Sequence, residues 1–303
     1  MADTPFPTGS ICLFAAYTPD GNLPEYTRHY LRELTHNGLT THCIFSGCQQ
    51  VSPSSALFCQ QHGIYPWPRA NDGLDFGAWQ FLLAQGVAHT APYIVLANDS
   101  VLGPLRPLRH VLHAHTPVRY PVWGMVATRL VTPHLQSWFV GLSHTVLHTP
   151  HVQRVLALPF ASMSRAEIIW HGELGLSVAI REAGFPLHAA WSDLHTPMAR
   201  MCATNPMHTR WYSLAASGQV PFLKRELLRD NPFGLPGLQH WRQTIPVGSA
   251  FQPDWIADLR TEAPRPRATR PNWKGRALYA LAATADRVVH GLRPVAPPAP
   301  PDD

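Results

Sequence analysis

The feature that most constrains this chain is the alternation of short strand-like runs with helix-like segments in its N-terminal third. Runs with the length of buried strands occur at Ile11–Ala16, Thr40–Ser46 and Tyr93–Ala97. Between them, Pro24–Asn37 and Asp75–Gln85 carry apolar side chains at helical spacing, and a glycine that can end a helix follows each. Because strands that alternate with helices usually pair in parallel, we predict an α/β fold with a mostly parallel sheet flanked by helices.

The second half of the chain shows a less regular pattern. Further strands are predicted at Val122–Thr128, Trp138–Leu142 and Leu187–Trp191. Further helices are predicted at His151–Leu158, Arg165–Ala183, Trp211–Gly218 and Val220–Arg229. With 303 residues, the chain is long enough to bury a sizeable core without disulfides.

Charge and cysteine usage narrow the range of partners only a little. The formal net charge is +5, which suits an anionic ligand, a membrane surface or nucleic acid equally well. The five cysteines form no CxxC pair, so we expect buried thiols of a reduced compartment. A zinc site at Cys43, Cys48, Cys59 and His62 is the alternative, although its spacing matches no usual pattern. The N-terminus has no signal-peptide pattern, and we expect a cytoplasmic protein.

A polar cluster ends the predicted strand at Tyr93–Ala97, where Asn98, Asp99 and Ser100 follow in succession. In open α/β sheets, ligands bind beyond the carboxyl ends of the strands. A carboxylate with flanking oxygens can hold a divalent cation, and such a cation can bridge a diphosphate. The alternative is an ordinary turn, in which these three residue types are favoured because they cap the next segment.

Two further acidic residues lie at predicted helix starts. Asp75 follows Asn71 and Gly73 in "NDGLDFGAW", where it can cap the helix or accept hydrogen bonds from a ribose or a base. Glu173, in "WHGELGLSVAIREAGF", can interact with the helix dipole or act as a general base that faces a cleft.

Several motifs together resemble the rhamnan synthesis protein F family of bacterial polysaccharide glycosyltransferases. They are "NDGLDFGAW", "LANDSVLGPL", "HLQSWF", "GELGLSVAIREAG" and "PFLKRELLRDNP", and the resemblance runs from about Ile11 to Trp241. It implies a GT-A-like, Rossmann-like domain at 1–241, followed by a basic, Pro-rich extension at 242–303. It also implies inverting transfer of a sugar, rhamnose by the family's name, from a nucleoside-diphosphate donor to a growing bacterial surface polysaccharide. A glycan- or nucleotide-binding protein without turnover is the alternative.

The resemblance also implies roles for individual residues. Asp99 and Glu173 would be the catalytic residues, with Glu173 as the base, although this chain keeps one acid where each family motif has two. Asp99 would hold a Mg²⁺ or Mn²⁺ ion, with His208 as a further ligand. The donor would contact Ala15, Ala16, Tyr17, Asn71, Gly73, Asp75, Asn98, Asp99 and Ser100. The acceptor, a glycan or lipid-linked glycan, would contact Trp123, Gly124, His134, Gln136, Ser137 and Trp138. For Trp138, core packing is the alternative.

Two groups of basic residues in the last third of the chain each have two interpretations. Lys224 and Arg225 can offset charge on a leaving diphosphate, or form a solvated helix face. The run from Arg265 to Arg276 precedes a predicted amphipathic helix at Trp273–Leu292. This segment can bind the anionic inner face of the cytoplasmic membrane, or the helix can pack on the domain. We expect no nucleic-acid partner, because the basic run lacks regularly interleaved aromatic residues.

Overall fold

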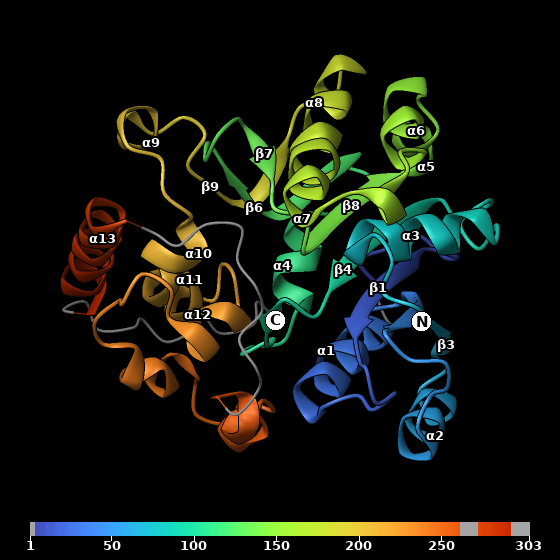
Figure 1. The fold of residues 1–303 in the computed structure, drawn as a ribbon, viewed down its shortest axis with the longest axis horizontal. Helices are drawn as coiled ribbons and strands as arrows, with labels where there is room; N and C mark the ends of the chain where they lie inside the picture. Colours follow the sequence, from blue (N-terminus) through green and yellow to red (C-terminus); the bar gives the residue numbers. More distant parts are fainter. Residues whose placement is uncertain (1–3, 261–271, 292–303) are drawn as a thin grey trace, which may run out of the picture.

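The computed structural model describes residues 4–260 and 272–291, and within these ranges eight strands form one central sheet (Figure 1). The strand order is β3-β2-β1-β4-β8-β6-β7, and β9 pairs with β6. Their bounds are β1 Ile11–Tyr17, β2 Thr40–Ser46, β3 Tyr65–Arg69, β4 Tyr93–Asn98, β6 Val122–Thr128, β7 His134–Leu135, β8 Phe139–Ser143 and β9 His188–Ser192.

The first four strands of this order are parallel, and the sheet becomes mixed beyond them. β1 pairs in parallel with β2 and β4, and β2 with β3, whereas β8 runs antiparallel to both β4 and β6. Since Ala15 of β1 lies in register with Asn98 of β4, the carboxyl ends of these two central strands meet at one edge. The predicted α/β class is confirmed, with a mostly parallel sheet, flanking helices and a C-terminal helix.

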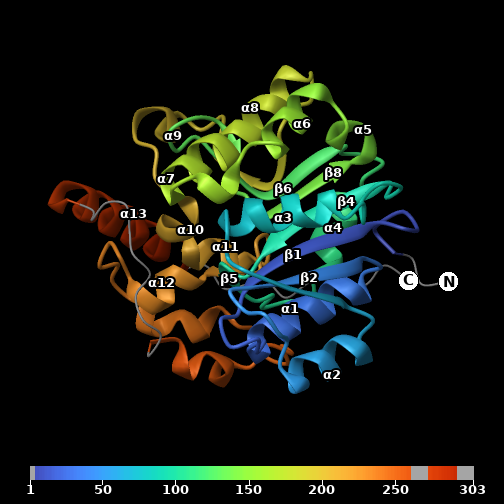
Figure 2. The same cartoon turned by 45° about the vertical axis from the view of Figure 1, so that its right-hand side comes forward.

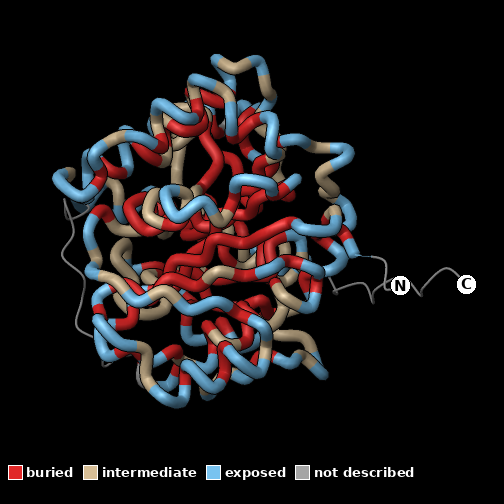
Figure 3. The backbone as a smooth tube through the Cα atoms, turned by 90° about the vertical axis from the view of Figure 1, so that its right-hand side faces the viewer, coloured by how far each residue is buried: buried red, intermediate tan, exposed pale blue. Residues whose placement is uncertain are grey.

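Helices cover both faces of the sheet (Figure 2). One face packs against α1 Glu25–His36, α2 Pro53–Gln61 and α4 Arg109–Ala114. The other packs against α3 Leu74–Ala84, α5 His144–Leu147, α6 Pro150–Leu156 and α8 Gly175–Glu182. Alternate residues of β1 supply the two cores: Phe14 faces the first and Leu13 the second, as the pleat of a strand requires. Burial is therefore greatest along the sheet (Figure 3).

A third core lies among the C-terminal helices, which gather beside the sheet in Figure 1. These elements are α10 Pro206–Thr209, α11 Trp211–Ser217, α12 Arg225–Asp230, η3 Leu238–Thr244, η4 Pro253–Arg260 and α13 Trp273–Gly291. The described side chains of the short helix α9 Pro197–Met201 contribute nothing to this core. Trp241, Phe251 and Tyr279 belong to the same cluster, so packing continues across the boundary expected at residue 242. A division of the chain there stays a prediction.

The structure corrects two predicted helices. In place of a helix over 220–229, Leu223–Lys224 forms strand β10, which pairs antiparallel with β5 Val101–Leu102, and α12 begins only at Arg225. Phe222 and Leu223 are buried in two different cores, and Pro221 before them disfavours a helix. The long helix over 165–183 is built from α7 Arg165–Glu167, the π-helix η2 Ile168–Leu174, and α8.

The cysteines and the C-terminal helix complete the description. All five cysteines are free thiols, and burial raises the pKa of Cys59 to about 11. Among the described residues, no cluster of three His, Cys, Asp or Glu side chains could hold a metal ion, which leaves the alternative zinc site without support. Within the same residues, no helix combines the length and the apolar character needed to cross a membrane. Arg265, Arg267 and Arg270 of the basic run lie outside the described residues.

Gly141 of β8 gives a test of this packing. A Cβ at Gly141 would lie 2.5 Å from the hydroxyl oxygen of Tyr93, whose side chain is completely buried. We expect Gly141→Ala to lower the free energy of unfolding by about 1–3 kcal/mol, because the buried Tyr93 ring would have to shift within the core. Urea unfolding of the full chain measures this change.

The matched control is Gly175→Ala. Gly175 has helical backbone angles, and a Cβ there would lie 3.6 Å from the nearest heavy atom, the carbonyl oxygen of Trp170. This substitution should leave stability unchanged or raise it by about 0.5–1 kcal/mol. Equal losses for the two variants would show that the close packing at Gly141 is not the cause.

Candidate functional site

A pocket at the carboxyl ends of β1 and β4 brings together residues that are far apart in the sequence. We call this cavity of about 170 Å³ the central pocket. It is lined by Leu74, Asp75, Phe76, Asn98, Asp99, Ser100, Ser137, Arg165, Ile168, Ile169, Glu173 and Lys224. Six of these residues were expected from the sequence at the catalytic, donor or acceptor site, from four separate motifs: Asp75, Asn98, Asp99, Ser100, Ser137 and Glu173. Lys224, from a fifth motif, was a candidate partner of the leaving diphosphate.

Asp99 forms a buried ion pair with Arg225. The Nη1 atom of Arg225 donates to Oδ2 of Asp99 at 2.8 Å, and 9% and 6% of the two side chains remain exposed. The backbone N–H of Tyr17 donates to the same oxygen at 3.3 Å. The Arg225 guanidinium also lies 5.5 Å from the centre of the Tyr26 ring. These contacts join β1, β4 and α12, and they neutralise the carboxylate inside the protein.

Asn98 and Ser100 order the turn after β4. The side-chain carbonyl of Asn98 accepts a hydrogen bond from the Ser100 N–H at 3.0 Å, which is the turn geometry typical of asparagine. Its amide nitrogen donates to Oδ2 of Asp75 at 2.8 Å. Asn98 therefore orders the turn and also orients a carboxylate of α3 in the central pocket, and its role in donor binding stays a prediction.

Lys224 enters the central pocket from β10. Its register opposite Val101 places Nζ 3.1 Å from Oγ of Ser100. Loss of hydration lowers the pKa of the Lys224 ammonium group, and nearby carboxylates, Glu173 first among them, act in the opposite direction. Lys224 therefore brings a partly dehydrated positive charge to the pocket, where an anionic group could replace the missing water.

Glu173 faces the pocket from the π-helix η2. Both the N–H and the hydroxyl of Ser137 donate to Oε2 of Glu173, at 2.8 and 2.5 Å. The other oxygen, Oε1, lies 3.8 Å from Nε2 of His134. The side chain keeps 23% of its surface exposed, so a ligand can reach the carboxylate. The neighbouring Gly172 allows η2 to pack closely against α3, since a Cβ there would lie 3.0 Å from the ring of Phe76.

The residues present do not fit a divalent cation held by Asp99 and His208. Asp99 is already neutralised by Arg225, and His208 is absent from the residues that line the central pocket. His208 is buried on α10, with Nε2 4.0 Å from Oε2 of Glu226 and its ring against Phe233. No group of three suitable ligands occurs anywhere in the described ranges.

The other expected donor residues are absent from the lining of the central pocket. Ala15 and Ala16 are buried within β1, where the Ala15 carbonyl accepts the Asp99 N–H at 3.1 Å. Tyr17 is 40% exposed at the end of that strand. Asn71 is half-buried before α3. Gly73 has a φ of 73° and would bring a Cβ within 2.9 Å of Phe160, so this position requires glycine for packing.

Three of the expected acceptor residues belong to the core. Trp123 is completely buried and packs on Phe139, and Trp138 packs on Phe222, which agrees with the core-packing alternative. Gly124 lies in β6, where a Cβ would meet the Phe139 carbonyl at 3.0 Å. Because side chains inside the core cannot contact a ligand, the acceptor role expected for these three residues does not agree with where they lie.

The remaining acceptor candidates have polar partners near Glu173. Gln136 is buried, accepting from the Trp138 indole N–H and donating to the side-chain oxygen of Asn205. His134 donates from Nδ1 to the Thr132 carbonyl at 2.8 Å. Ser137 is the one that lines the central pocket, through its contact with Glu173.

Sequence reasoning missed Arg165, which lines the rim of the central pocket as an exposed side chain. A signal for its helix position does exist, because Ser164 and Glu167 form a capping box that starts α7. No sequence pattern indicates that the chain then enters a π-helix, although such turns frequently occur at functional sites.

Comparison with known proteins adds little to this geometry. No protein-family model matches the chain, and no curated protein sequence is significantly similar to it. Among solved structures, the chain is similar to mouse xyloside xylosyltransferase 1 in its apo form. The two share 12% sequence identity over 70% of this chain and 93% of that chain, with a TM-score of 0.34. A likeness at this level carries no argument about function, and the resemblance to the rhamnan synthesis protein F family stays a prediction.

The Asp99–Arg225 pair can be tested by a double-mutant cycle. Arg225→Met leaves a buried carboxylate without its main partner and should lower the free energy of unfolding by about 3–5 kcal/mol. Asp99→Asn removes the charged partner of the guanidinium and should also lower the free energy of unfolding. The double variant should lose less than the sum of the two single losses, since neither charge remains. Urea unfolding measures all four proteins, and strictly additive losses would show that the pair is not coupled.

Proposed function

We propose that this protein is a glycosyltransferase that moves a sugar from a nucleoside-diphosphate donor to a glycan hydroxyl. One observation carries the proposal: the central pocket places the cation Lys224 and the hydroxyl of Ser100 beside the reachable carboxylate of Glu173. A cation can offset the charge that develops on a leaving diphosphate, and a carboxylate can take the proton of an attacking hydroxyl. The sequence resemblance supports the same chemistry, with a GT-A-like fold, rhamnose as the donor sugar and a bacterial surface polysaccharide as the product.

The donor would lie across the carboxyl ends of β1 and β4. Its nucleoside would face the exposed Tyr17 and the carboxylate of Asp75, whose oxygen can accept from a ribose or a base. Its diphosphate would then reach Ser100 and Lys224. Because Lys224 is partly dehydrated, an anionic group beside it would interact more strongly than in bulk water. In this arrangement Asp99 is a positioning residue, because its carboxylate is committed to Arg225.

Glu173 would act as the base in a single displacement. Its carboxylate accepts the proton of the acceptor hydroxyl while that oxygen bonds to the anomeric carbon. The bond between the anomeric carbon and the diphosphate oxygen breaks in the same step, and the anomeric centre is inverted. The two hydrogen bonds from Ser137 to Oε2 fix the orientation of the carboxylate, which leaves Oε1 for the acceptor.

A second candidate function is binding without turnover. The observation that favours it is the Asp99–Arg225 pair, which removes the acid that the resemblance would assign to catalysis. Release of nucleoside diphosphate from a nucleotide sugar separates the two functions, since a binding protein retains its ligand unchanged.

Glu173→Gln and Lys224→Met should affect two different steps, namely sugar transfer and donor binding. Glu173→Gln keeps the side-chain shape without the basicity, so transfer should fall about 10²–10⁴-fold while donor affinity persists. Lys224→Met should weaken donor binding, because it removes the positive charge beside the diphosphate. EDTA should not change this result, since the proposed site holds the donor without a metal ion. Donor binding is measured by thermal shift with a panel of nucleotide sugars, and transfer by the release of nucleoside diphosphate.

The control for this experiment is Glu25→Gln, an exposed carboxylate on α1 paired with Arg28 and outside the central pocket. It should match the unmodified protein in both assays. Undiminished transfer by Glu173→Gln would show that another group is the base. Donor binding that survives Lys224→Met would refute the role of that lysine.

We also propose that the protein sits on the anionic inner face of the cytoplasmic membrane through α13. This helix buries Tyr279, Ala283 and Asp286, and Tyr279 accepts the Asn205 N–H. Its other side exposes large apolar side chains, namely Trp273, Leu278, Leu281, Val288 and Val289. Lys274 and Arg276 lie in its first turn. An apolar face with flanking cations is typical of helices that lie in the interface plane.

Leu281→Glu/Val288→Glu should weaken co-sedimentation with vesicles that contain phosphatidylserine. The buried side of α13 is unchanged, so the fold and donor binding should persist. Leu57→Glu, at a similarly exposed position on α2, is the matched control and should bind vesicles as the unmodified protein does. Vesicle binding equal to that of the unmodified protein, at low and high salt, would contradict the membrane proposal.

A further inference from the structure

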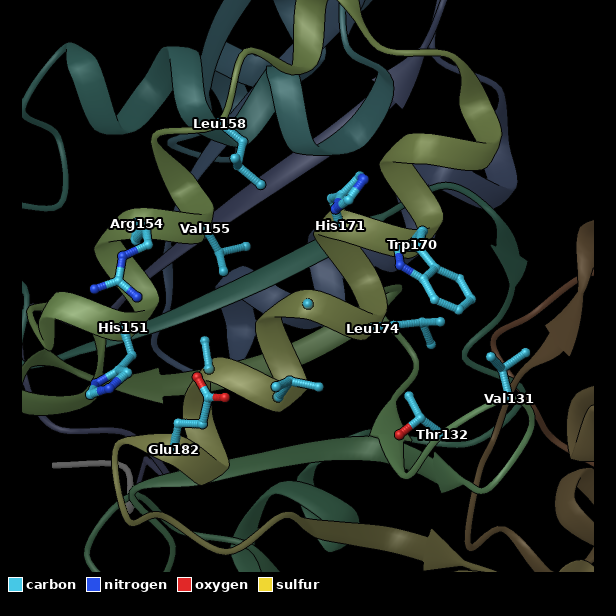
Figure 4. Close-up of a pocket in the computed structure, with 13 residues that line it drawn as sticks. Val131, Thr132, His151, Arg154, Val155, Leu158, Trp170, His171, Leu174 and Glu182 are labelled. Atoms are coloured by element: carbon cyan, nitrogen blue, oxygen red, sulfur yellow. The ribbon is translucent and has the colours of Figure 1, made fainter.

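A second cavity, which we call the side hollow, lies next to the central pocket. Its volume is about 480 Å³, within the range of small-molecule sites. It is formed by α6, by the segment η2–α8, and by the loop between β6 and β7 (Figure 4). We propose that the side hollow binds the acceptor glycan, with Trp170 as the platform for one sugar ring. This inference rests on the proposed glycosyl transfer.

The lining of the side hollow suits a carbohydrate. Figure 4 shows apolar side chains, Val155 and Leu174 among them, between Trp170 at one end and Arg154 with Glu182 at the other. A sugar ring has an apolar C–H face and a rim of hydroxyls, so it needs both an apolar surface and polar partners. One cation and one anion at the rim make the hollow a poor site for a strongly charged ligand such as a diphosphate.

Trp170 is unusual among the tryptophans of the described chain. Only Trp170 and Trp273 are exposed there, and 60% of the Trp170 surface is open to solvent. The tryptophans first expected at the acceptor site, Trp123 and Trp138, are inside the core and cannot serve. Of these two exposed tryptophans in the described residues, Trp170 is the one that lines the side hollow, and it lies three residues before Glu173 in the chain.

The side hollow and the central pocket share η2 as a wall. On η2, Ile169 and Glu173 line the central pocket, whereas the next residues in the chain, Trp170 and Leu174, line the hollow. A second link runs through His134, which donates to the Thr132 carbonyl in the wall of the hollow and approaches Oε1 of Glu173 to 3.8 Å. In the proposed arrangement, a glycan whose terminal hydroxyl reaches Glu173 would extend past η2 and place its preceding sugar units in the side hollow.

The test uses the full chain and an array of trisaccharides and longer saccharides containing rhamnose, glucose, galactose or N-acetylglucosamine. The saccharide bound best is then titrated. Trp170→Ala should weaken its binding about tenfold or more, and Trp170→Phe should retain much of it, because an aromatic face remains. Val178→Phe, which fills the hollow from α8, should also weaken binding. Trp273→Ala, the other exposed tryptophan, should have no effect.

Donor binding, measured in parallel by thermal shift with the nucleotide-sugar panel, separates this inference from the proposed function. All variants should keep it, because none of these residues lines the central pocket. If no saccharide binds, or if binding survives both Trp170→Ala and Val178→Phe, the acceptor assignment is wrong. If the protein then still binds and turns over a donor, the proposed function stands without it. Absence of both donor binding and turnover would instead refute the proposed function.

Discussion

The buried ion pair between Asp99 and Arg225 is the interaction on which the rest of the site depends. Removing two charges from water costs several kcal/mol for each, and close hydrogen bonds must compensate for that cost. Here Arg225 and the Tyr17 N–H both donate to Asp99, and the Arg225 N–H donates to the Ser100 carbonyl at 2.9 Å. The pair thereby attaches the C-terminal helices to the central strands, and it holds the adjacent Lys224 against the turn after β4.

The central pocket combines groups that stabilise the fold with groups that do not. Asp99 and Asn98 hold strand ends together, through the pair with Arg225 and the hydrogen bonds with Asp75 and Ser100. Lys224 is different, because loss of hydration lowers the pKa of its ammonium group, against the opposite effect of nearby carboxylates. Glu173 is oriented by Ser137 yet partly exposed. Such a division, with some charges satisfied and others left for a ligand, is a frequent property of binding and catalytic sites.

The sequence predicts the sheet well because strand signals are local. The predicted β2 and β6 agree with the structure in both bounds, and the polar end of β4 follows from residues that adjoin one another. Lys224 could not be placed in this way, because its position depends on pairing with Val101, over 120 residues earlier. Nor does the sequence reveal that Trp138 is buried: it follows the polar Gln136 and Ser137 in the turn before β8, yet its side chain packs against Phe222 in the core.

The π-helix η2 has a consequence for how the chain around Glu173 can change. An α-helix advances by about 100° per residue, and a π-helical turn holds one residue more than an α-helical turn. The wide turn of η2 therefore accommodates one residue more than a regular helix would hold there, so removing one residue could give a regular helix while α7 and α8 keep their present neighbours. The change would fall within η2 itself, where the residues that face the two cavities would shift relative to one another. The helical phase within this one turn, more than the identity of any residue in it, determines that Glu173 faces one cavity and Leu174 the other.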